Sequence, residues 1–496
     1  MRVCLLNESF PPVIDGVVNV MLNYADYMMR DFGAKIIVGT PRYPGGKYDS
    51  YPYKVVDYPS FDTAAQTNGY RAGNPLVGKA VSELADFGPD IIHTHGPASA
   101  TVVARLVREM TGAPIVFTYH TKYDIDIRRA ARIDLIAEET IKAMVGNIEA
   151  CDEIWTVSDG AGKSLKALGF QGDYRVMNNG VDFAKGRVDK ETVAKVTAGY
   201  DLPEDVPCFL YVGRLINYKN LPLILDALKI LADSGQDFRM VFVGKGPDRE
   251  ILEKKAAELG LMGEGARAGE AHSLNGQGLG VRTAPGAKVF FTGPIYDRNE
   301  LRAWNTRADL FLFPSTFDTN GLVVREAAAC GLASVLIKDS CAAEGITDDR
   351  NGFIIEESAE DMAELLKKLC GHLDHVHDVG RNAMDEIYLS WEECVAKAYE
   401  RYRYILARNK VGAMPHHKKQ ATDNMVKVVA GMMEEQDRLR KNIKEMVGDM
   451  HSKALEMADY TMKDVLHDKL SVDSRKLHWN DIIDDLWTEV EEHLRK

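Results

Sequence analysis

The feature that most constrains the fold of this chain is an alternation of short apolar runs with amphipathic stretches, which occurs twice along the sequence. In the first part, runs rich in β-branched and aromatic residues are each followed by a stretch with helical spacing. These runs are Arg2–Leu6, Lys35–Gly39, Asp90–His93, Pro114–Thr118, Glu153–Val157 and Tyr174–Met177. Continuous apolar runs of this length are typical of parallel strands that are buried on both faces. The pattern predicts an α/β fold with a doubly wound parallel sheet.

The alternation stops at the turn-rich sequence NNGVD and restarts after a polar stretch. The second set of apolar runs comprises Cys208–Val212, Arg239–Val243, Lys288–Thr292, Leu310–Phe313 and Ala333–Ile337. We therefore predict two Rossmann-like domains, 1–184 and 207–390, which face each other across a cleft and are joined by a linker over 185–206. The stretch Gly263–Gly286 is rich in glycine and predicts a mobile surface loop inserted into the second domain.

Beyond about Trp391 the pattern is purely helical, and we predict a crossing helix over 391–410 and an all-helical extension over 411–496. In the extension, mostly apolar residues alternate spacings of four and three: Met425, Val429, Met432, Gln436, Leu439, Ile443, Met446 and Met450. Such a heptad stripe needs a partner surface, because a long exposed apolar stripe favours aggregation. We expect it to pack within a helical bundle and to associate with a second copy of the chain.

Composition narrows the class of protein. With 45% hydrophobic and 27% charged residues the chain is an ordinary globular protein, and no uncharged apolar run reaches the roughly 18 residues of a membrane span. The net charge of −13 disfavours broad binding to nucleic acid. The cysteines are scattered without C-x-x-C pairs, which favours a reducing compartment such as the cytoplasm. The opening MRVCLLNESF predicts a buried first strand and not a signal peptide.

The most informative motif is PSTFDTNGLVVREAAACG, which joins a predicted strand to a predicted helix. A strand end that feeds a helix N-terminus is where open α/β sheets bind ligands. We expect the free amides of Gly321, Leu322 and Val323 to hold an anion such as a phosphate, with Asn320 beside them as part of the same binding site. Asp318 in the loop and Glu326 on the helix offer two carboxylates, one for the hydroxyls of a sugar and one for those of a ribose.

Two further segments end predicted strands with polar residues. YVGRLINYKNL places Gly213, Arg214 and Lys219 at a strand end, where two fixed cations would neutralise a departing diphosphate without a metal ion. In the first domain, Gly16 lies at a strand-to-helix transition where the backbone can approach a phosphate or an acceptor. His120 follows another strand, and a neutral imidazole there can bind hydroxyl groups.

Other kinds of site fit the sequence less well. Asp124 and Asp126 spell the D-x-D of metal-dependent sugar transferases, but those enzymes have a single-domain fold. Two histidine groups do not predict a metal site, because one ends different strands and the other lacks an enclosing core: His93, His95 and His120, and His372, His375 and His377. Neither G-x-G-x-x-G after the first strand nor G-x-x-x-x-G-K-[ST] occurs, which argues against a dinucleotide oxidoreductase and a P-loop NTPase.

In this order the motifs resemble the retaining glycosyltransferases of family 4, which have the GT-B fold. The matching pieces, over about Met1–Arg408, are FPPVIDGVVNV, PDIIHTHGP, APIVFTYHT, CDEIWTVSDGAGKSL, NNGVD, YVGRLINYKN, VFVGKGP, FFTGPI and DTNGLVVREAAACG. Most are modest alone, but as a series with this spacing they are specific. The resemblance implies transfer of a hexose from a nucleotide sugar, with retention at the anomeric carbon and without a metal or other cofactor.

The resemblance also implies roles for particular residues. Asp318 would contact the transferred sugar, Glu326 the ribose, Arg214 and Lys219 the diphosphate, and His120 the sugar. The base, most often uracil, would be bordered by Gly244–Pro247 and by Pro294 and Ile295. Two positions depart from the family pattern. The family usually has Glu where this chain has Asp318, and Gly-Gly is common where it has Asp15 and Gly16.

The acceptor is left open between two classes. The DTNGL and YHTKYD stretches resemble bacterial diacylglycerol glucosyltransferases in particular, which implies UDP-glucose as donor and a lipid as acceptor. Three arginines lie beside three isoleucines and predict a basic, partly apolar element that docks on a membrane: Arg128, Arg129, Arg132, Ile125, Ile127 and Ile133. A solvated helix face explains the same residues equally well, so a soluble sugar or protein acceptor stays open. A non-catalytic scaffold is disfavoured, because it has no chemical need for these acids, cations and His120 together.

Overall fold

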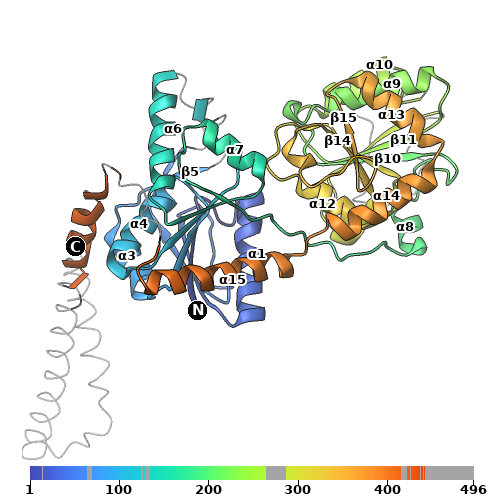
Figure 1. Cartoon of the computed structure of the whole chain (residues 1–496). Coiled ribbons are helices and arrows are strands. Elements are labelled where there is room, and N and C mark those ends of the chain that lie inside the picture. The colour runs from blue at the N-terminus through green and yellow to red at the C-terminus, as the bar shows by residue number, and fades with distance from the viewer. Residues whose placement is uncertain are drawn as a thin grey trace, which may run out of the picture.

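The computed structural model describes residues 1–13, 15–63, 70–124, 127–128, 134–263, 286–414, 420, 422–424, 426–435, 437–438 and 441. Figure 1 shows two α/β domains side by side, with one long helix, α15 (Trp391–Lys410), that returns from the second domain to lie along the first. The GT-B arrangement of two Rossmann-like domains is confirmed. Within the described residues, no helix combines the length and the apolar character that crossing a membrane requires.

The first domain is built on a parallel sheet with the strand order β3-β2-β1-β6-β7-β8-β9. The expected first strand lies inside this sheet between β2 and β6, and every residue of Val3–Leu6 is fully buried. The strands are β1 (Arg2–Leu6), β2 (Lys35–Pro41), β3 (Lys54–Tyr58), β6 (Ile91–Thr94), β7 (Ile115–Tyr119), β8 (Glu153–Thr156) and β9 (Arg175–Val176). The helices are α1 (Gly16–Phe32), α3 (Gly78–Asp86), α4 (Ser99–Thr111), α6 (Asp134–Glu149) and α7 (Asp159–Ala167), with a small hairpin of β4 (Ser60–Asp62) and β5 (Arg71–Gly73).

The second domain repeats the scheme with the order β12-β11-β10-β13-β14-β15. Its strands are β10 (Cys208–Val212), β11 (Arg239–Val243), β12 (Val289–Gly293), β13 (Leu310–Phe313), β14 (Ala333–Ile337) and β15 (Phe353–Ile355). Its helices are α8 (Lys190–Thr197), α9 (Leu221–Asp233), α10 (Arg249–Glu258), α11 (Arg298–Arg307), α12 (Leu322–Ala329), α13 (Ala359–Cys370) and α14 (Leu373–Glu386), with short turns η1 (Asn217–Lys219) and η2 (Cys341–Ala343).

In each sheet the direction of winding reverses at one place. The reversal lies between β1 and β6 in the first domain and between β10 and β13 in the second, because the chain moves outward to one side of the central strand and then crosses to the other. At such a switch point the loops after the two strands part and leave a crevice at their carboxyl ends. These two crevices are therefore where ligands are expected.

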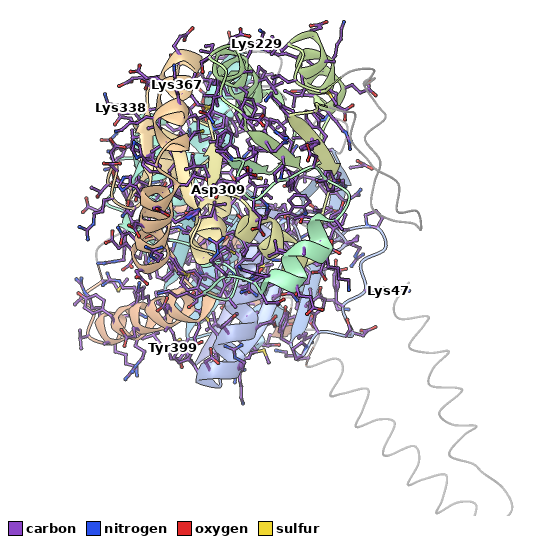
Figure 2. The ribbon with its side chains drawn as sticks, turned by 90° about the vertical axis from the view of Figure 1, so that its right-hand side faces the viewer. Lys47, Lys229, Asp309, Lys338, Lys367 and Tyr399 are labelled. Carbon is purple, nitrogen blue, oxygen red and sulfur yellow. The ribbon has the colours of Figure 1, made fainter. Side chains whose placement is uncertain are left out.

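The crossing helix α15 belongs to the core of the first domain. It begins with a capping box between Ser390 and Glu393, and it buries Trp391, Val395, Tyr402 and Ile405 against the first sheet and its neighbours, among others. Tyr399, labelled in Figure 2, stacks on Phe32 at the end of α1 with ring centroids 4.3 Å apart. Helix α15 thus completes the first domain, although it follows the second domain in sequence.

Two segments differ from the sequence-based expectation. The predicted linker over 185–206 contains the helix α8, which is capped by Asp189 and packs against α11 of the second domain. The sequence did not predict α8, because none of its residues is buried and it therefore lacks an apolar stripe. The edge strand β3 and the β4–β5 hairpin were not predicted, since their runs are short and interrupted by tyrosine and aspartate. The inserted stretch 264–285 lies outside the described residues.

The described part of the extension docks on the first domain along a different face from the predicted stripe. Val426, Ala430 and Met433 are buried against that domain, whereas Met432 of the predicted stripe is 67% exposed. The error has a simple cause: each of the buried side chains lies one position after a member of the heptad pattern. Of the remaining stripe members, Val429 is half-buried and the others lie outside the described residues.

A buried ion pair anchors this segment. The side chain of Arg105 on α4 is only 2% exposed, and its Nη2 donates to the Oδ1 atom of Asp423 and to the Oγ1 atom of Thr422, both at 2.8 Å. Nη1 of the same guanidinium donates to Asn147 on α6 at 2.8 Å. A buried guanidinium needs such partners, because leaving it unpaired costs several kcal/mol. The docked segment is therefore an integral part of the first domain.

Candidate active site

The switch crevice of the second domain holds a fixed ion pair. Lys219 in η1 follows β10, Asp318 follows β13, and the Nζ atom of Lys219 lies 2.5 and 2.7 Å from the two carboxylate oxygens of Asp318. The two side chains are 12% and 23% exposed. The ammonium group also lies 5.4 Å from the centre of the Phe313 ring and 5.8 Å from that of Tyr218. Two residues predicted to contact different parts of a donor are thus brought together across the switch point.

Glycines at the carboxyl ends of β10 and β11 allow the loops to come this close. A Cβ atom on Gly244 would lie 1.8 Å from the carbonyl oxygen of Gly213, and one on Gly246 would lie 2.0 Å from that of Leu215. No side chain fits at either position, so the predicted glycines Gly213 and Gly244 fix the shape of the crevice wall. Arg214, between these contacts, is exposed at the crevice edge.

The N-terminus of α12 opens at the same crevice. Gly321 precedes it with φ of +59°, and no side chain caps the first amides, which begin at Leu322. Both polar atoms of the Asn320 side chain are buried without a hydrogen-bond partner among the described residues. Uncapped amides with the positive end of a helix dipole attract an anion, and a buried amide without partners is costly unless a ligand meets it. The structure confirms the expected strand–loop–helix junction.

Glu326 lies about one turn into α12 and is held by an arginine. Nη2 of Arg298, at the start of α11, donates to Oε1 of Glu326 at 2.6 Å, and its guanidinium stacks over the Phe183 ring at 4.4 Å. Burial raises the pKa of Glu326, and the adjacent Arg298 opposes that shift by favouring the charged form. The sequence offered no signal for Arg298, because its partner is reached only in the folded chain.

The loop after β12 forms another wall of the second-domain edge. Pro294 and Ile295 follow β12 directly, with Pro294 exposed and Ile295 half-buried against the core. The amide of Gly244 donates to the carbonyl of Gly293 at 2.9 Å, which links this loop to the one after β11. The residues expected to border a base therefore lie on neighbouring loops of one edge.

The first domain presents histidines instead of charges. His120 follows β7 and is only 6% exposed, and its Nε2 atom is 2.9 Å from Nδ1 of His95. His93 lies in β6, two residues before His95. Its Nδ1 atom is 2.5 Å from the hydroxyl of Tyr402, and its Nε2 atom is 2.7 Å from the hydroxyl of Thr118. Burial lowers the pKa of His120 to about 3 and also depresses the pKa values of His93 and His95. All three imidazoles are therefore neutral at ordinary pH.

These contacts correct one expectation about the histidines. We expected His93, His95 and His120 to end different strands, but His93 lies in β6 and His95 directly follows it. The ring nitrogens of His93 bond hydroxyl groups, and Nδ1 of His95 bonds Nε2 of His120, whereas Nε2 of His95 is buried without a partner among the described residues. In the part of the chain that the structure describes, no group of three or more His, Cys, Asp or Glu side chains is arranged to hold a metal ion.

Gly16 occupies the expected strand-to-helix transition but in a different setting. It is the first residue of α1 and is exposed, and the preceding Asp15 caps the helix by accepting from the amides of Val17 and Val18 at 2.8 Å. The Asp15 carboxylate also accepts from Tyr70 at 2.7 Å. The position that carries glycine in the family pattern thus supplies a carboxylate to the helix N-terminus, which leaves fewer free amides beside Gly16.

The two family models that match this chain follow each other along it. One, described as Glycosyltransferase Family 4, matches residues 14–185, and the other, described as Glycosyl transferases group 1, matches residues 206–372. These spans correspond to the two domains with their two crevices. All seven cysteines are free, which agrees with their scattered positions in the sequence.

Several proteins are similar to the chain. The sulfoquinovosyl transferase SQD2 of Arabidopsis thaliana is 27% identical, over 78% of this chain and 70% of that protein. The alpha-monoglucosyldiacylglycerol synthase of Acholeplasma laidlawii is 21% identical, over 74% of this chain and 87% of that protein. Among solved structures, Anabaena HepE in complex with UDP has a TM-score of 0.62 at 18% identity, covering 82% of this chain and all of that one.

A second solved structure, sucrose-phosphate synthase of Thermosynechococcus elongatus, has a TM-score of 0.58 at 17% identity, covering 82% of this chain and 99% of that one. Likeness at such identity concerns the fold, and it agrees with the two parallel sheets and their facing switch points. The family models, in sequence order on the two domains, add the family. The chain is a glycosyltransferase of family 4 with the GT-B fold.

Proposed function

We propose that this glycosyltransferase moves a hexose, with glucose as the first candidate, from a UDP-sugar to a hydroxyl group of a membrane lipid. The observation that carries the proposal is the second-domain crevice, where Lys219 and Asp318 face the uncapped N-terminus of α12. A diphosphate fits a lysine beside free helix amides, and sugar hydroxyls fit a carboxylate. A solved protein of the same fold, Anabaena HepE, is in complex with UDP and glucose, which supports this donor class.

In this proposal each donor part has its own partner. The ribose is bound by Glu326, which accepts a hydrogen bond from Arg298, and the base lies between Gly244 and the pair Pro294 and Ile295. Asn320 offers its buried amide to the donor. Arg214 at the crevice edge joins Lys219 in stabilising the charge of the leaving diphosphate.

The proposed chemistry is retaining and relies on orientation and charge stabilisation. The acceptor hydroxyl attacks the anomeric carbon on the face from which the diphosphate leaves, so the C–O bond to the acceptor forms as the bond to the phosphate breaks. The acceptor proton passes to the departing diphosphate, which Lys219 and Arg214 neutralise. His120 is neutral and binds a sugar hydroxyl. Because the two cations perform the task that a divalent ion performs elsewhere, we propose that no metal is required.

Support for a lipid acceptor comes from the surface near α6. Leu135 and Ile136 at its start are 71% and 51% exposed, and the nearby Arg128 is 46% exposed, paired with Glu138. Exposed aliphatic side chains beside a cation fit a membrane interface. Ile127, which we expected to face the membrane, instead packs against the first-domain core, and Ile125, Arg129, Arg132 and Ile133 lie outside the described residues. The relative named alpha-monoglucosyldiacylglycerol synthase supports this acceptor class.

The full chain, purified and incubated with several UDP- and GDP-sugars and with lipid or soluble acceptors, tests the proposal by mass spectrometry of the products. We expect a hexosyl lipid from UDP-glucose and diacylglycerol vesicles, retention of the anomeric configuration by NMR, and activity that persists in EDTA. Liposome flotation should show binding to anionic vesicles that weakens with salt. Transfer to a soluble acceptor only, without flotation at low salt, contradicts the lipid proposal, and activity that returns only with manganese contradicts the metal-free one.

We also propose that the extension over 411–496 associates with a second copy of the chain. Because Arg105 and Asp423 anchor its first part on the first domain, the informative truncation ends after Lys441 and removes residues 442–496. Light scattering should give a smaller assembly for the truncated chain, while its affinity for UDP is unchanged. The same number of copies in full-length and truncated protein would remove the association claim.

A further inference from the structure

The loop that carries Asp318 is tied directly to the first domain. Thr319, the next residue, donates from Oγ1 to the carbonyl oxygen of His120 at 2.5 Å. The carbonyl oxygen of Thr319 in turn accepts from the hydroxyl of Ser158 at 2.5 Å. One residue of the second domain thus makes two hydrogen bonds to the first, and both lie at the carboxyl edges of the two sheets.

A carboxylate makes a second connection between the domains. Glu344, which follows η2, accepts from the amide of Asp159 at 2.7 and 2.9 Å and from that of Gly160 at 3.3 Å. These amides open α7, whose positive dipole end attracts a negative charge. A residue of the second domain therefore caps a helix of the first, next to the cap that Ser158 provides to Ala161 at 2.9 Å.

Close packing accompanies these hydrogen bonds. A Cβ atom built on Gly160 would lie 2.5 Å from Sγ and 3.4 Å from Cβ of Cys341. Only a residue without a side chain fits at that position while Cys341 keeps its place. We call the group formed by Thr319, Glu344, Ser158, Gly160 and Cys341 the interdomain catch.

We propose that Thr319 is a positioning residue that sets His120 and Asp318 on either side of the transferred sugar, and that Glu344 and the rest of the interdomain catch hold the domains in that arrangement. The inference rests on the proposed function for the roles of His120 and Asp318. Its physical basis is that few bonds separate the two side chains. Asp318 and Thr319 are neighbours in the chain, and a single hydrogen bond links Thr319 to the backbone of His120. The imidazole is held from the other side by His95.

The expected effect follows from the loss of one hydrogen bond at a buried acceptor. In Thr319→Val the carbonyl of His120 loses its partner, while the shape of the side chain is kept. Such a loss corresponds to about a tenfold fall in the population of the aligned arrangement. Because neither Glu326 nor the α12 amides change, we expect kcat to fall about tenfold and the affinity for UDP to stay within about twofold.

Two variants sharpen this kinetic test. Thr319→Ser keeps the hydroxyl and should restore most of kcat. Thr316→Val makes the same change three positions earlier, at an exposed side chain on the same loop, and should behave like the wild type. A general loss of folding would lower UDP binding and thermal stability together with kcat, whereas misalignment lowers kcat alone.

A crosslink measures the catch without any activity. In Gly160→Cys the Sγ atom of Cys341 must turn away from the new Cβ atom, and the two Cβ atoms are then close to disulfide distance. Oxidised glutathione should therefore join the domains by thiol–disulfide exchange that releases two molecules of reduced glutathione. Gly160→Cys combined with Cys341→Ala is the control that cannot form this bond. Adding Thr319→Val or Glu344→Gln to Gly160→Cys should slow the crosslink about fivefold, because the domains spend less time in contact, while Thr316→Val should leave its rate unchanged.

The outcomes separate the two claims. Wild-type protein that turns over no nucleotide sugar contradicts the proposed function, yet the crosslinking rates still test the catch. Wild-type protein that is active while Thr319→Val keeps its kcat and its crosslinking rate contradicts the inference and leaves the proposed function standing. A fall in kcat that Thr319→Ser does not reverse also counts against a role for the hydroxyl.

Discussion

The two domains share one topology but treat their switch crevices in opposite ways. In the first domain, carboxylates occupy the N-termini of α1 and α4, the two helices that follow the strands at the switch point. Glu8, just after β1, accepts from the amides of Ala98 and Ala100 at the start of α4 at 3.0 and 2.9 Å, and Asp15 caps α1. In the second domain, α9, α10 and α12 begin without a side-chain cap, although Asp297 caps α11.

This difference teaches which partner each edge accepts. In the second domain the free amides of α12 and the nearby Lys219 can bind an anion, whereas in the first domain Glu8 and Asp15 already accept from the amides of α4 and α1, and the neutral imidazole of His120 lies at the same edge. A charged diphosphate donor fits the second-domain edge, where amides are free, and an uncharged hydroxyl acceptor fits the first-domain edge, where carboxylates already occupy the amides. We propose that the two domains divide donor and acceptor binding through the choice of capping residues.

Removing the Lys219 ammonium group from the second-domain crevice should have the largest effect on turnover. We expect Lys219→Ala to lower kcat/KM at least about 100-fold, because the diphosphate loses its charge-assisted partner and Asp318 loses its counter-ion. Lys338→Ala is the matched control: Lys338 follows β14 of the same sheet, is labelled at the surface in Figure 2, and pairs with the exposed Glu356. Steady-state kinetics should place the control within about twofold of the wild type. Equal losses in the two variants would mean that the crevice is misassigned.

Smaller losses should follow at the two other donor contacts of the second domain. Arg214→Ala and Glu326→Ala should each reduce turnover at least about tenfold, since a hydrogen bond to a charged group is worth about 1.5–3 kcal/mol. Asp318→Glu keeps the carboxylate and should retain part of the activity. Initial rates at saturating acceptor decide the matter. If Arg214→Ala turns over like the wild type, the diphosphate is not where we place it.

The neutral histidines of the first domain should make the stability of the protein depend on pH. Because burial lowers the pKa of His120 to about 3, the unfolded chain binds a proton below pH 6.5 that the folded chain refuses until about pH 3. Stability should therefore fall with acidification, by about 2 kcal/mol from this one group between pH 7 and pH 5. Chemical denaturation at both pH values should show a smaller fall for His120→Asn. Equal falls in both proteins would show that His120 takes up its proton in the folded chain.

The smallest effect on turnover is expected at the filled crevice itself. In Glu8→Gln the amide oxygen can still accept from Ala98 and Ala100, and the amide nitrogen can donate to the hydroxyl of Ser99, so we expect kcat within about twofold of the wild type. Burial raises the pKa of Glu8, so its charge costs stability as the pH rises through that pKa. Thermal melts should show that the variant gains stability relative to the wild type between pH 4 and pH 8. A large loss of turnover would indicate a ligand site in this crevice.

Much of this contrast was open to prediction, because its ingredients are local in sequence. Apolar runs fix the strands, and a glycine at a strand-to-helix junction fixes the uncapped start of α12. The pairing of Lys219 with Asp318 was not predictable, since the two lie 99 positions apart and meet only through the strand order. The same holds for Arg298 with Glu326 and for Thr319 with His120, which are defined by tertiary contacts alone.

The side chains that cap helices are the second feature that the sequence did not predict. Gly16 follows a family pattern that predicts backbone contacts with a ligand, yet the side chain of Asp15 already occupies those amides. Aspartate is a common N-cap, so the signal was present but pointed equally to a cap and to a solvated acid. Glu8 caps a helix that begins some 90 residues later, and no local pattern reveals such a contact.

A crystal structure of the full chain with bound UDP tests most directly the claim that the second-domain crevice is the donor site. The account predicts the diphosphate within hydrogen-bond distance of the Lys219 ammonium group and of the first amides of α12, with the ribose hydroxyls on Glu326. It also predicts that Glu8 keeps its bonds to Ala98 and Ala100. A nucleotide bound at the first-domain crevice with Glu8 displaced, or a diphosphate remote from Lys219, would contradict it.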